Sequence, residues 1–184
     1  QQAMEENLLC PFHYFGITDL SMIGDEEAAR DFNMLTSDER VRHIVNQADY
    51  YGYSGDKVKG LIFCSNIKET EELSAKFNQI INPATGKNFR TVALNGSASE
   101  QERQDAFERL AMNEDESSED RQPLDYIFSV EILNEGVDIV EVNQVIMLRP
   151  TQSPIVFIQQ LGRGLRKASG KEYVISLEII TIIL

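Results

Sequence analysis

Short, continuous apolar runs alternate with amphipathic stretches along most of the chain beyond residue 58. Runs of this length, apolar at nearly every position, are typical of strands that are covered on both faces of a sheet. Strands that alternate with helices predict an α/β fold with a parallel sheet, right-handed crossovers and helices on both faces. The predicted strands are Leu61–Cys64, Thr91–Leu94, Tyr126–Phe128, Gln144–Leu148 and Tyr173–Leu177.

Capping residues and helical spacing predict the helices. A helix over about residues 36–51 has Ser37 as its N-cap and apolar residues three and four positions apart, at Val41, Ile44, Val45 and Ala48. Asn66 and Ser99 each stand three residues before a glutamate, which is the pattern of a capping box. A further helix is predicted over about residues 154–166. The two helices after the capping boxes are expected to bury Leu73, Phe77, Ile80 and Ile81, and Ala106, Phe107 and Leu110.

The first 35 residues mix apolar and acidic positions without a clean period, which indicates a connecting segment. We therefore divide the chain into a connecting segment, residues 1–57, which includes the helix over about residues 36–51, and an α/β domain, residues 58–184. Because an apolar run continues to Leu184, this domain is expected to be truncated at its C-terminus. The aromatic residues that follow Pro11 are expected to pack on the protein, since no basic residues accompany them.

The composition allows one good core in 184 residues and gives a net charge of −13. This acidity argues against a simple nucleic-acid-binding module, which usually carries a basic face, so any phosphate contact must be local. No stretch approaches the roughly 18–20 apolar residues of a membrane helix, and the first residues lack the features of a secretory signal. Cys10 and His13 have metal-ligand spacing but no second pair of ligands, and Cys64 falls in an apolar run. We expect a reduced, cytoplasmic protein with no metal site and no membrane contact.

The segment from Gln159 to Arg166 contains the strongest candidate chemistry. Arg163 and Arg166 are three apart on a predicted helix, so their guanidinium groups project from one face. Two such groups can bind the oxygens of a polyphosphate and neutralise charge that develops during phosphoryl transfer. An amphipathic surface helix with incidental arginines remains the alternative for this segment alone.

A second candidate is the turn from Ser129 to Ile139, where a strand ends and Gly136 and Asp138 close a short loop. The Asp138 carboxylate can accept hydrogen bonds from ribose hydroxyls or hold a nearby arginine. Backbone N–H groups early in the loop can bind a phosphate. A plain strand-to-helix loop with a turn glycine explains the segment more simply when it is taken alone.

Together these segments resemble the C-terminal RecA-like domain of superfamily 2 helicases, over residues ~58 to 178. Leu61–Asn66 is similar to motif IV, Leu94–Ser97 with Arg103 follows, Glu131–Asp138 is similar to motif V, and Gln159–Arg166 to motif VI. The phrase from Leu133 to Val142 is closest to the branch of excision-repair helicases, restriction-enzyme translocation subunits and branch-migration helicases. Gln159, where DEAD-box proteins carry histidine, favours the same branch.

The resemblance implies a three-layer RecA-like sheet and the second motor domain of an ATP-dependent helicase or translocase. Arg163 and Arg166 would reach the γ-phosphate of ATP with Mg²⁺, held mainly by the N-terminal RecA-like domain of the same polypeptide. Gln159, Gly136 and Asp138 would line that nucleotide site. The candidates for nucleic-acid contact, with DNA favoured over RNA, are Ser65, Asn66, Gly96, Ser97 and Ser129.

Two departures limit these expectations. Many members have threonine where this chain has Val130, and valine cannot donate to a phosphate, so Ser129 or a backbone N–H would have to replace that contact. The chain also lacks the phosphate loop G-x-x-x-x-G-K-[ST], so alone it is expected not to hydrolyse ATP. The alternative function is a RecA-like protein-interaction scaffold without motor activity, whose acidic surface mimics nucleic acid.

Overall fold

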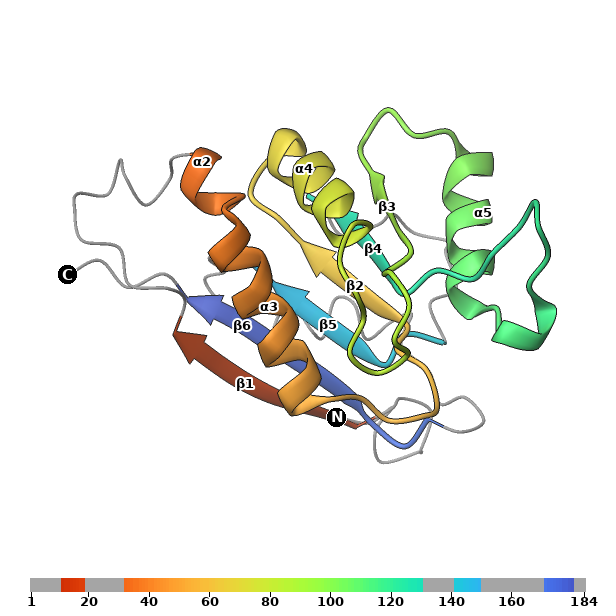
Figure 1. Cartoon of the computed structure of the whole chain (residues 1–184), viewed down its shortest axis with the longest axis horizontal. Coiled ribbons are helices and arrows are strands. Elements are labelled where there is room, and N and C mark those ends of the chain that lie inside the picture. The colour runs from red at the N-terminus through yellow and green to blue at the C-terminus, as the bar shows by residue number, and fades with distance from the viewer. Residues whose placement is uncertain (1–10, 19–31, 131–140, 150–170, 181–184) are drawn as a thin grey trace, which may run out of the picture.

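The computed structural model describes residues 11–18, 32–130, 141–149 and 171–180. Their strands form one six-stranded sheet in the order β1-β6-β5-β2-β4-β3, and every neighbouring pair is parallel (Figure 1). The predicted parallel α/β fold of RecA-like type is therefore confirmed. The strands are β1 (Phe12–Thr18), β2 (Gly60–Phe63), β3 (Thr91–Leu94), β4 (Tyr126–Ser129), β5 (Gln144–Met147) and β6 (Val174–Ile180).

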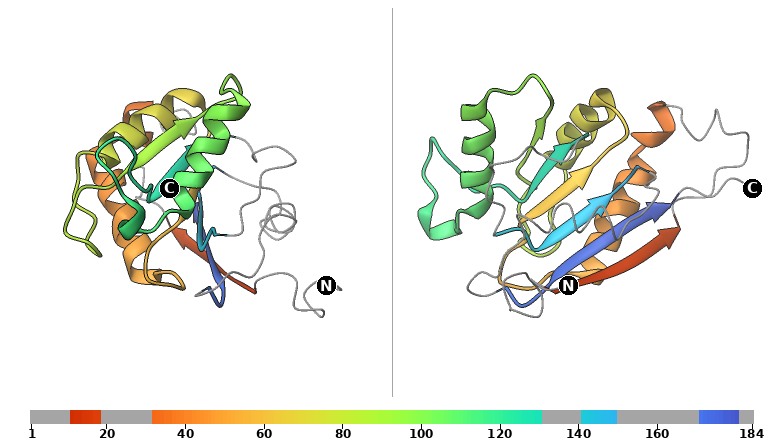
Figure 2. Two further views of the ribbon diagram at one scale, coloured as in Figure 1. Left: turned by 90° about the vertical axis from the view of Figure 1, so that its right-hand side faces the viewer. Right: turned by 180° about the vertical axis from the view of Figure 1, so that it is seen from behind.

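Helices cover both faces of this sheet, as Figure 2 shows from the side. The short α2 (Phe32–Leu35) precedes α3 (Asp38–Tyr51), which packs with α4 (Ile67–Phe77) on one face, and α5 (Glu100–Ala111) packs on the other. Because successive strand residues point to opposite faces, β2 contributes Leu61 and Phe63 to the core under α5 and Ile62 to the core under α3 and α4. These two apolar cores fix the position of every strand end.

The predicted helix starts are confirmed. Ser37, Asn66 and Ser99 are the N-caps of α3, α4 and α5, and each side chain accepts a hydrogen bond from the first turn of its helix. The expected buried faces of α3 and α5 are buried. The prediction for the end of α4 was wrong, because the helix stops at Phe77 and Ile81 is 61% exposed in a bridge to Asn88.

Strand β1 was missed by the pattern of apolar positions. It forms the edge of the sheet and pairs with β6, so residues 12–18 belong to the sheet although they precede residue 58. Most of its side chains are exposed on both faces, which leaves no period-2 signal. Its aromatic residues contact the protein but stay exposed on one side: Tyr14, which is 37% exposed, donates to the Glu178 carboxylate, and the ring of Phe15, which is 36% exposed, lies 4.5 Å from that of Tyr51.

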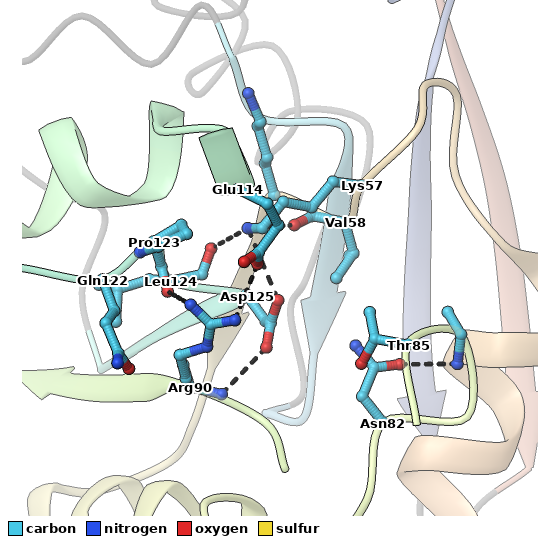
Figure 3. Close-up of polar contacts among 12 residues, drawn as sticks. Lys57, Val58, Asn82, Thr85, Arg90, Glu114, Gln122, Pro123, Leu124 and Asp125 are labelled. Atoms are coloured by element: carbon cyan, nitrogen blue, oxygen red, sulfur yellow. Dashed lines mark hydrogen bonds and ion pairs between the residues drawn. The ribbon is translucent and has the colours of Figure 1, made fainter. Parts of the chain in front are cut away.

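Residues just before β2, β3, β4 and β5 form the amino edge of the sheet, which is dense in ion pairs (Figure 3). Asp125 accepts a hydrogen bond from the Arg90 backbone N–H at 2.9 Å and lies 3.6 Å from Lys57. The Arg90 guanidinium lies 2.8 Å from the Glu114 carboxylate in the 3₁₀ turn η2 (Glu114–Glu116). Burial lowers the pKa of Lys57, and the Asp125 charge opposes that effect. The cations at this edge hold the strands together.

Candidate nucleic-acid interface

The opposite, carboxyl edge brings three of the predicted segments together. Phe63 in β2 and Leu94 in β3 both stand opposite Ser129 at the end of β4. The Cys64 N–H continues the ladder by donating to the Ser129 carbonyl at 2.8 Å, and the Leu148 N–H donates to the Phe63 carbonyl at 2.8 Å. The segments after β2 and β3 therefore both leave the sheet at its carboxyl edge, on either side of β4, where ligand sites of parallel α/β sheets lie (Figure 1).

The first segment, which we call the β2 loop, consists of Ser65 and Asn66, and both residues are exposed. The Asn66 side-chain oxygen accepts the Glu69 N–H at 2.9 Å and so begins α4. The N-terminus of this helix, with its partial positive charge, therefore lies at the carboxyl edge beside the exposed side chain of Lys68. An anion at this point would meet a helix N-terminus, an amide and one cation.

The second segment, which we call the β3 loop, consists of residues 95–98. Gly96 and Ser97 are exposed, while the Asn95 side chain accepts from the Ser97 N–H at 2.8 Å and from its hydroxyl. The Arg103 guanidinium donates to the Gly96 carbonyl at 3.4 Å. Helix α5 starts directly afterwards at the Ser99–Glu102 capping box, whose backbone hydrogen bond from Ser99 lowers the pKa of Glu102. The β3 loop thus has a fixed shape and presents small, neutral groups.

Ser129 differs from the other predicted contact residues. It is only 4% exposed, because β3 and β2 flank it on both sides. Next to it, the Val130 carbonyl accepts a hydrogen bond from the Arg149 guanidinium at 2.7 Å, so Arg149 ties the end of β5 to the end of β4. A phosphate contact at this strand end must therefore come from groups beyond the Ser129 side chain.

The structure tests only part of the predicted site. The candidate nucleotide residues Gly136, Asp138, Gln159, Arg163 and Arg166 lie outside the described residues, as does the helix predicted over about residues 154–166. Ser65 and Asn66 lie at the carboxyl edge on one side of β4, and Gly96 and Ser97 lie at the same edge on the other side. Sequence reasoning missed Arg40 and Arg149, and it took Glu69 only as half of a capping box. A charged residue inside an apolar helical stripe, as Arg40 is beside Val41 and Ile44, was the available signal.

Comparison with known families decides the broader assignment. Residues 39–168 match the family described as helicase conserved C-terminal domain. The chain belongs to this family. The helicase C-terminal domain match begins in α3 and includes the β2 and β3 loops together with the segments expected to form motifs V and VI. In the part of the chain that the structure describes, no helix is both long and apolar enough to cross a membrane.

A relative from Methanocaldococcus jannaschii that carries the name of an ATP-dependent RNA helicase is 28% identical over 177 residues, covering 86% of this chain. The chain spans 21% of that relative's length. Among solved structures, the Type ISP restriction-modification enzyme LlaBIII bound to DNA aligns with a TM-score of 0.59 and 19% identity over 98% of this chain and 12% of its own.

Two DEAD-box structures align in the same way. A DEAD-box protein from Methanococcus jannaschii gives a TM-score of 0.55 at 16% identity, over 97% of this chain and 37% of its own. Domain 2 of the DEAD-box helicase Mss116p, bound to an RNA duplex, gives a TM-score of 0.52 at 17% identity, over 90% of this chain and 53% of its own. Identities this low support the fold alone, so the branch within superfamily 2 is not resolved by them.

Proposed function

We propose that this helicase C-terminal domain is the second motor domain of an ATP-driven nucleic-acid translocase or helicase, and that its carboxyl edge contacts the nucleic-acid backbone. One observation carries the proposal: the exposed β2 and β3 loops, each followed by a helix N-terminus, lie at the same edge of the sheet, on either side of the end of β4. Phosphates bind N–H groups and helix N-termini without needing a basic surface. This explains how a chain with net charge −13 can bind a polyanion.

The proposed contacts in the described residues are Ser65, Asn66, Gly96 and Ser97. The Ser65 hydroxyl can donate to a phosphate oxygen, whereas the Ser97 hydroxyl donates to the Asn95 side chain and would have to exchange that bond for one to phosphate. Gly96 has no side chain to keep a nucleic-acid backbone away; a Cβ built there meets nothing within 4 Å. The Ser129 side chain is the weakest candidate because it is buried. At that strand end, backbone N–H groups beyond Ser129 are the better donors.

For nucleotide chemistry, the proposal assigns Arg163 and Arg166 as arginine fingers that act on ATP held with Mg²⁺ by the N-terminal motor domain. Gln159, Gly136 and Asp138 would line the same interface. Arginine suits this role because it stays charged and donates in a fixed fork to phosphoryl oxygens. ATP binding would close the two domains and hydrolysis would release them, so that each cycle advances the strand.

We propose DNA, most simply duplex DNA, as the substrate. Gln159 and the motif V phrase support the restriction-subunit and excision-repair branch, whose members act on DNA. The relative named as an RNA helicase supports the RNA alternative. The choice between the two nucleic acids is therefore an outcome of the experiment.

The test is ATP turnover by the natural full-length polypeptide, with and without matched DNA and RNA duplexes and single strands. We expect strong stimulation by nucleic acid, DNA above RNA, and no turnover by residues 1–184 alone. Turnover that does not respond to any nucleic acid would contradict the motor assignment. That result would favour the non-motor scaffold, which the acidic charge of −13 also allows.

A further inference from the structure

A buried ion pair lies directly behind the β2 loop. Arg40 in α3 and Glu69 in α4 are joined at 3.0 Å between Nη1 and Oε1, and their side chains are 1% and 0% exposed. Burying two charges costs solvation free energy, which their attraction offsets only when the geometry is good and the remaining polar atoms are also satisfied. The hydrogen bonds that Arg40 and Glu69 make outside the pair show which segments the pair holds in place.

The second oxygen of Glu69 binds the β2 loop. Its Oε2 accepts a hydrogen bond from the Ser65 backbone N–H at 2.9 Å. The Asn66 side chain accepts from the Glu69 N–H at 2.9 Å, and the Thr70 hydroxyl donates to the Asn66 carbonyl at 2.9 Å. A charged acceptor holds an N–H more firmly than a neutral acceptor does, so the backbone at Ser65 is fixed by the carboxylate.

The other end of the pair is anchored at the α2–α3 junction. Arg40 Nη1 also donates to the Leu35 carbonyl at 2.7 Å. Farther along α4, Lys76 donates to the Thr36 carbonyl at 2.6 Å and lies 3.0 Å from Asp38. Helix α4 is thus tied to this junction near both of its ends. A continuous set of polar contacts runs from Leu35 through Arg40 and Glu69 to Ser65.

We propose that Arg40 and Glu69 are positioning residues for nucleic-acid binding, which fix the backbone of the β2 loop so that Ser65 and Asn66 meet the phosphate. This inference rests on the proposed function of the carboxyl edge. Neither residue touches the nucleic acid. Glu69 acts through the Ser65 N–H, and Arg40 acts by holding the Glu69 carboxylate in place and linking it to the α2–α3 junction.

Removing only one charge would leave the other buried and unpaired, which can unfold the protein for reasons unrelated to binding. Two double variants avoid this problem. In Arg40→Met with Glu69→Gln, both charges are lost but an amide oxygen remains to accept from Ser65. In Arg40→Met with Glu69→Met, a side chain of similar length offers no oxygen.

The comparison is made in the natural full-length polypeptide with fluorescein-labelled DNA and RNA oligonucleotides, by anisotropy. We expect the Gln variant to bind within about twofold of the unmodified protein, and the Met variant to bind roughly fivefold to tenfold more weakly, because an unsatisfied N–H leaves the loop free to move. Hydrogen exchange at the Ser65 amide should be faster in the Met variant and close to normal in the Gln variant. Equal affinity of the two variants would overturn the inference.

Two further variants distinguish a failure of the Arg40–Glu69 inference from a failure of the proposed nucleic-acid interface. Ser97→Asp puts a negative charge in the β3 loop and should weaken binding strongly; no change there would overturn the proposed interface itself. Tyr126→Phe removes a buried hydrogen bond to Gln144 next to the amino edge and should leave affinity unchanged. If a double variant does not fold, Glu69→Asp retains the charge on a shorter side chain and should weaken binding while the Tyr126→Phe control does not.

Discussion

The amino and carboxyl edges of the sheet use polar residues in opposite ways. At the amino edge, Lys57, Lys59 and Arg90 lie 3.6, 3.4 and 2.8 Å from carboxylates, and each also donates to a backbone carbonyl. At the carboxyl edge, the exposed residues of the β2 and β3 loops are neutral and small. Cations at the first edge are bound to carboxylates and carbonyls of the protein, whereas the second edge presents exposed, neutral side chains at two helix N-termini.

This difference teaches that net charge is a poor guide to polyanion binding. The chain has 17 basic and 30 acidic residues, yet much of the acidic excess lies away from the carboxyl edge, for example in the exposed residues 113–120. A phosphate backbone senses mainly charges within about 10 Å at ordinary ionic strength. The local donors therefore decide binding, and the following variants test each edge separately.

The largest expected effect comes from replacing the arginines proposed to act on ATP, with an arginine of the amino edge as the control. Arg163→Ala and Arg166→Ala should lower nucleic-acid-stimulated turnover by roughly a thousandfold, the typical loss for an arginine finger. Arg90→Ala, at the amino edge, should leave turnover unchanged and lower only stability. The measurement is steady-state ATP hydrolysis by the full-length polypeptide. Normal turnover in both the Arg163 and the Arg166 variant would contradict their assignment as arginine fingers.

The next effect concerns stability at the amino edge. Asp125→Ala should lower the free energy of unfolding by about 2–4 kcal/mol, because it leaves Lys57 and the Arg90 N–H without their shared acceptor in a buried position. Chemical denaturation followed by circular dichroism measures this loss. Asp120→Ala, an exposed carboxylate, is the control and should change stability by less than about 0.5 kcal/mol. Nucleic-acid affinity should be the same in both variants.

The elements that the sequence predicted well are those with a strong local signal. Helices α3, α4 and α5 begin at recognisable caps. Strands β2, β4 and β5 lie within one residue of their predicted bounds, because burial of every residue forces a continuous apolar run. The edge strand β3, which is half-buried at Val92 and Ala93, has the predicted bounds as well. Strand β1 could not be found in this way. Its side chains are largely exposed, so only its pairing with β6, which is far away in sequence, makes it a strand.

The candidate site shows the same limit. The alternation of strands and helices predicted that the β2 and β3 loops would lie at one edge, because parallel strands bring their carboxyl ends to the same side of a sheet. The Arg40–Glu69 pair joins residues 29 positions apart, and no local pattern specifies such a contact. The burial of Ser129 likewise depends on its two neighbouring strands. Contacts that depend on tertiary packing were the ones missed.

A smaller effect is expected when equal charges are removed at the two edges. Lys68→Ala, in the first turn of α4, should weaken binding about twofold to fivefold and reduce the salt dependence of log affinity by roughly one phosphate contact. Lys87→Ala removes an exposed charge from the turn before β3, near the amino edge, and should change neither quantity. Titrations at several salt concentrations measure both. Equal slopes for the two variants would remove Lys68 from the interface.

The smallest effect on the native protein is expected at Cys64, which marks where the buried strand ends and the accessible loop begins. Burial raises the pKa of the Cys64 thiol, and the residue is 0% exposed, so in a Cys10→Ser background it should hardly react with a thiol reagent before unfolding. Adding Ser65→Cys places a second thiol one residue further along, in the exposed β2 loop, where labelling should be rapid. Bound oligonucleotide should slow that labelling if the β2 loop contacts the backbone. Fast labelling of Cys64 itself would mean that the end of β2 opens readily. That result would contradict the fixed backbone of the β2 loop on which the proposed binding depends.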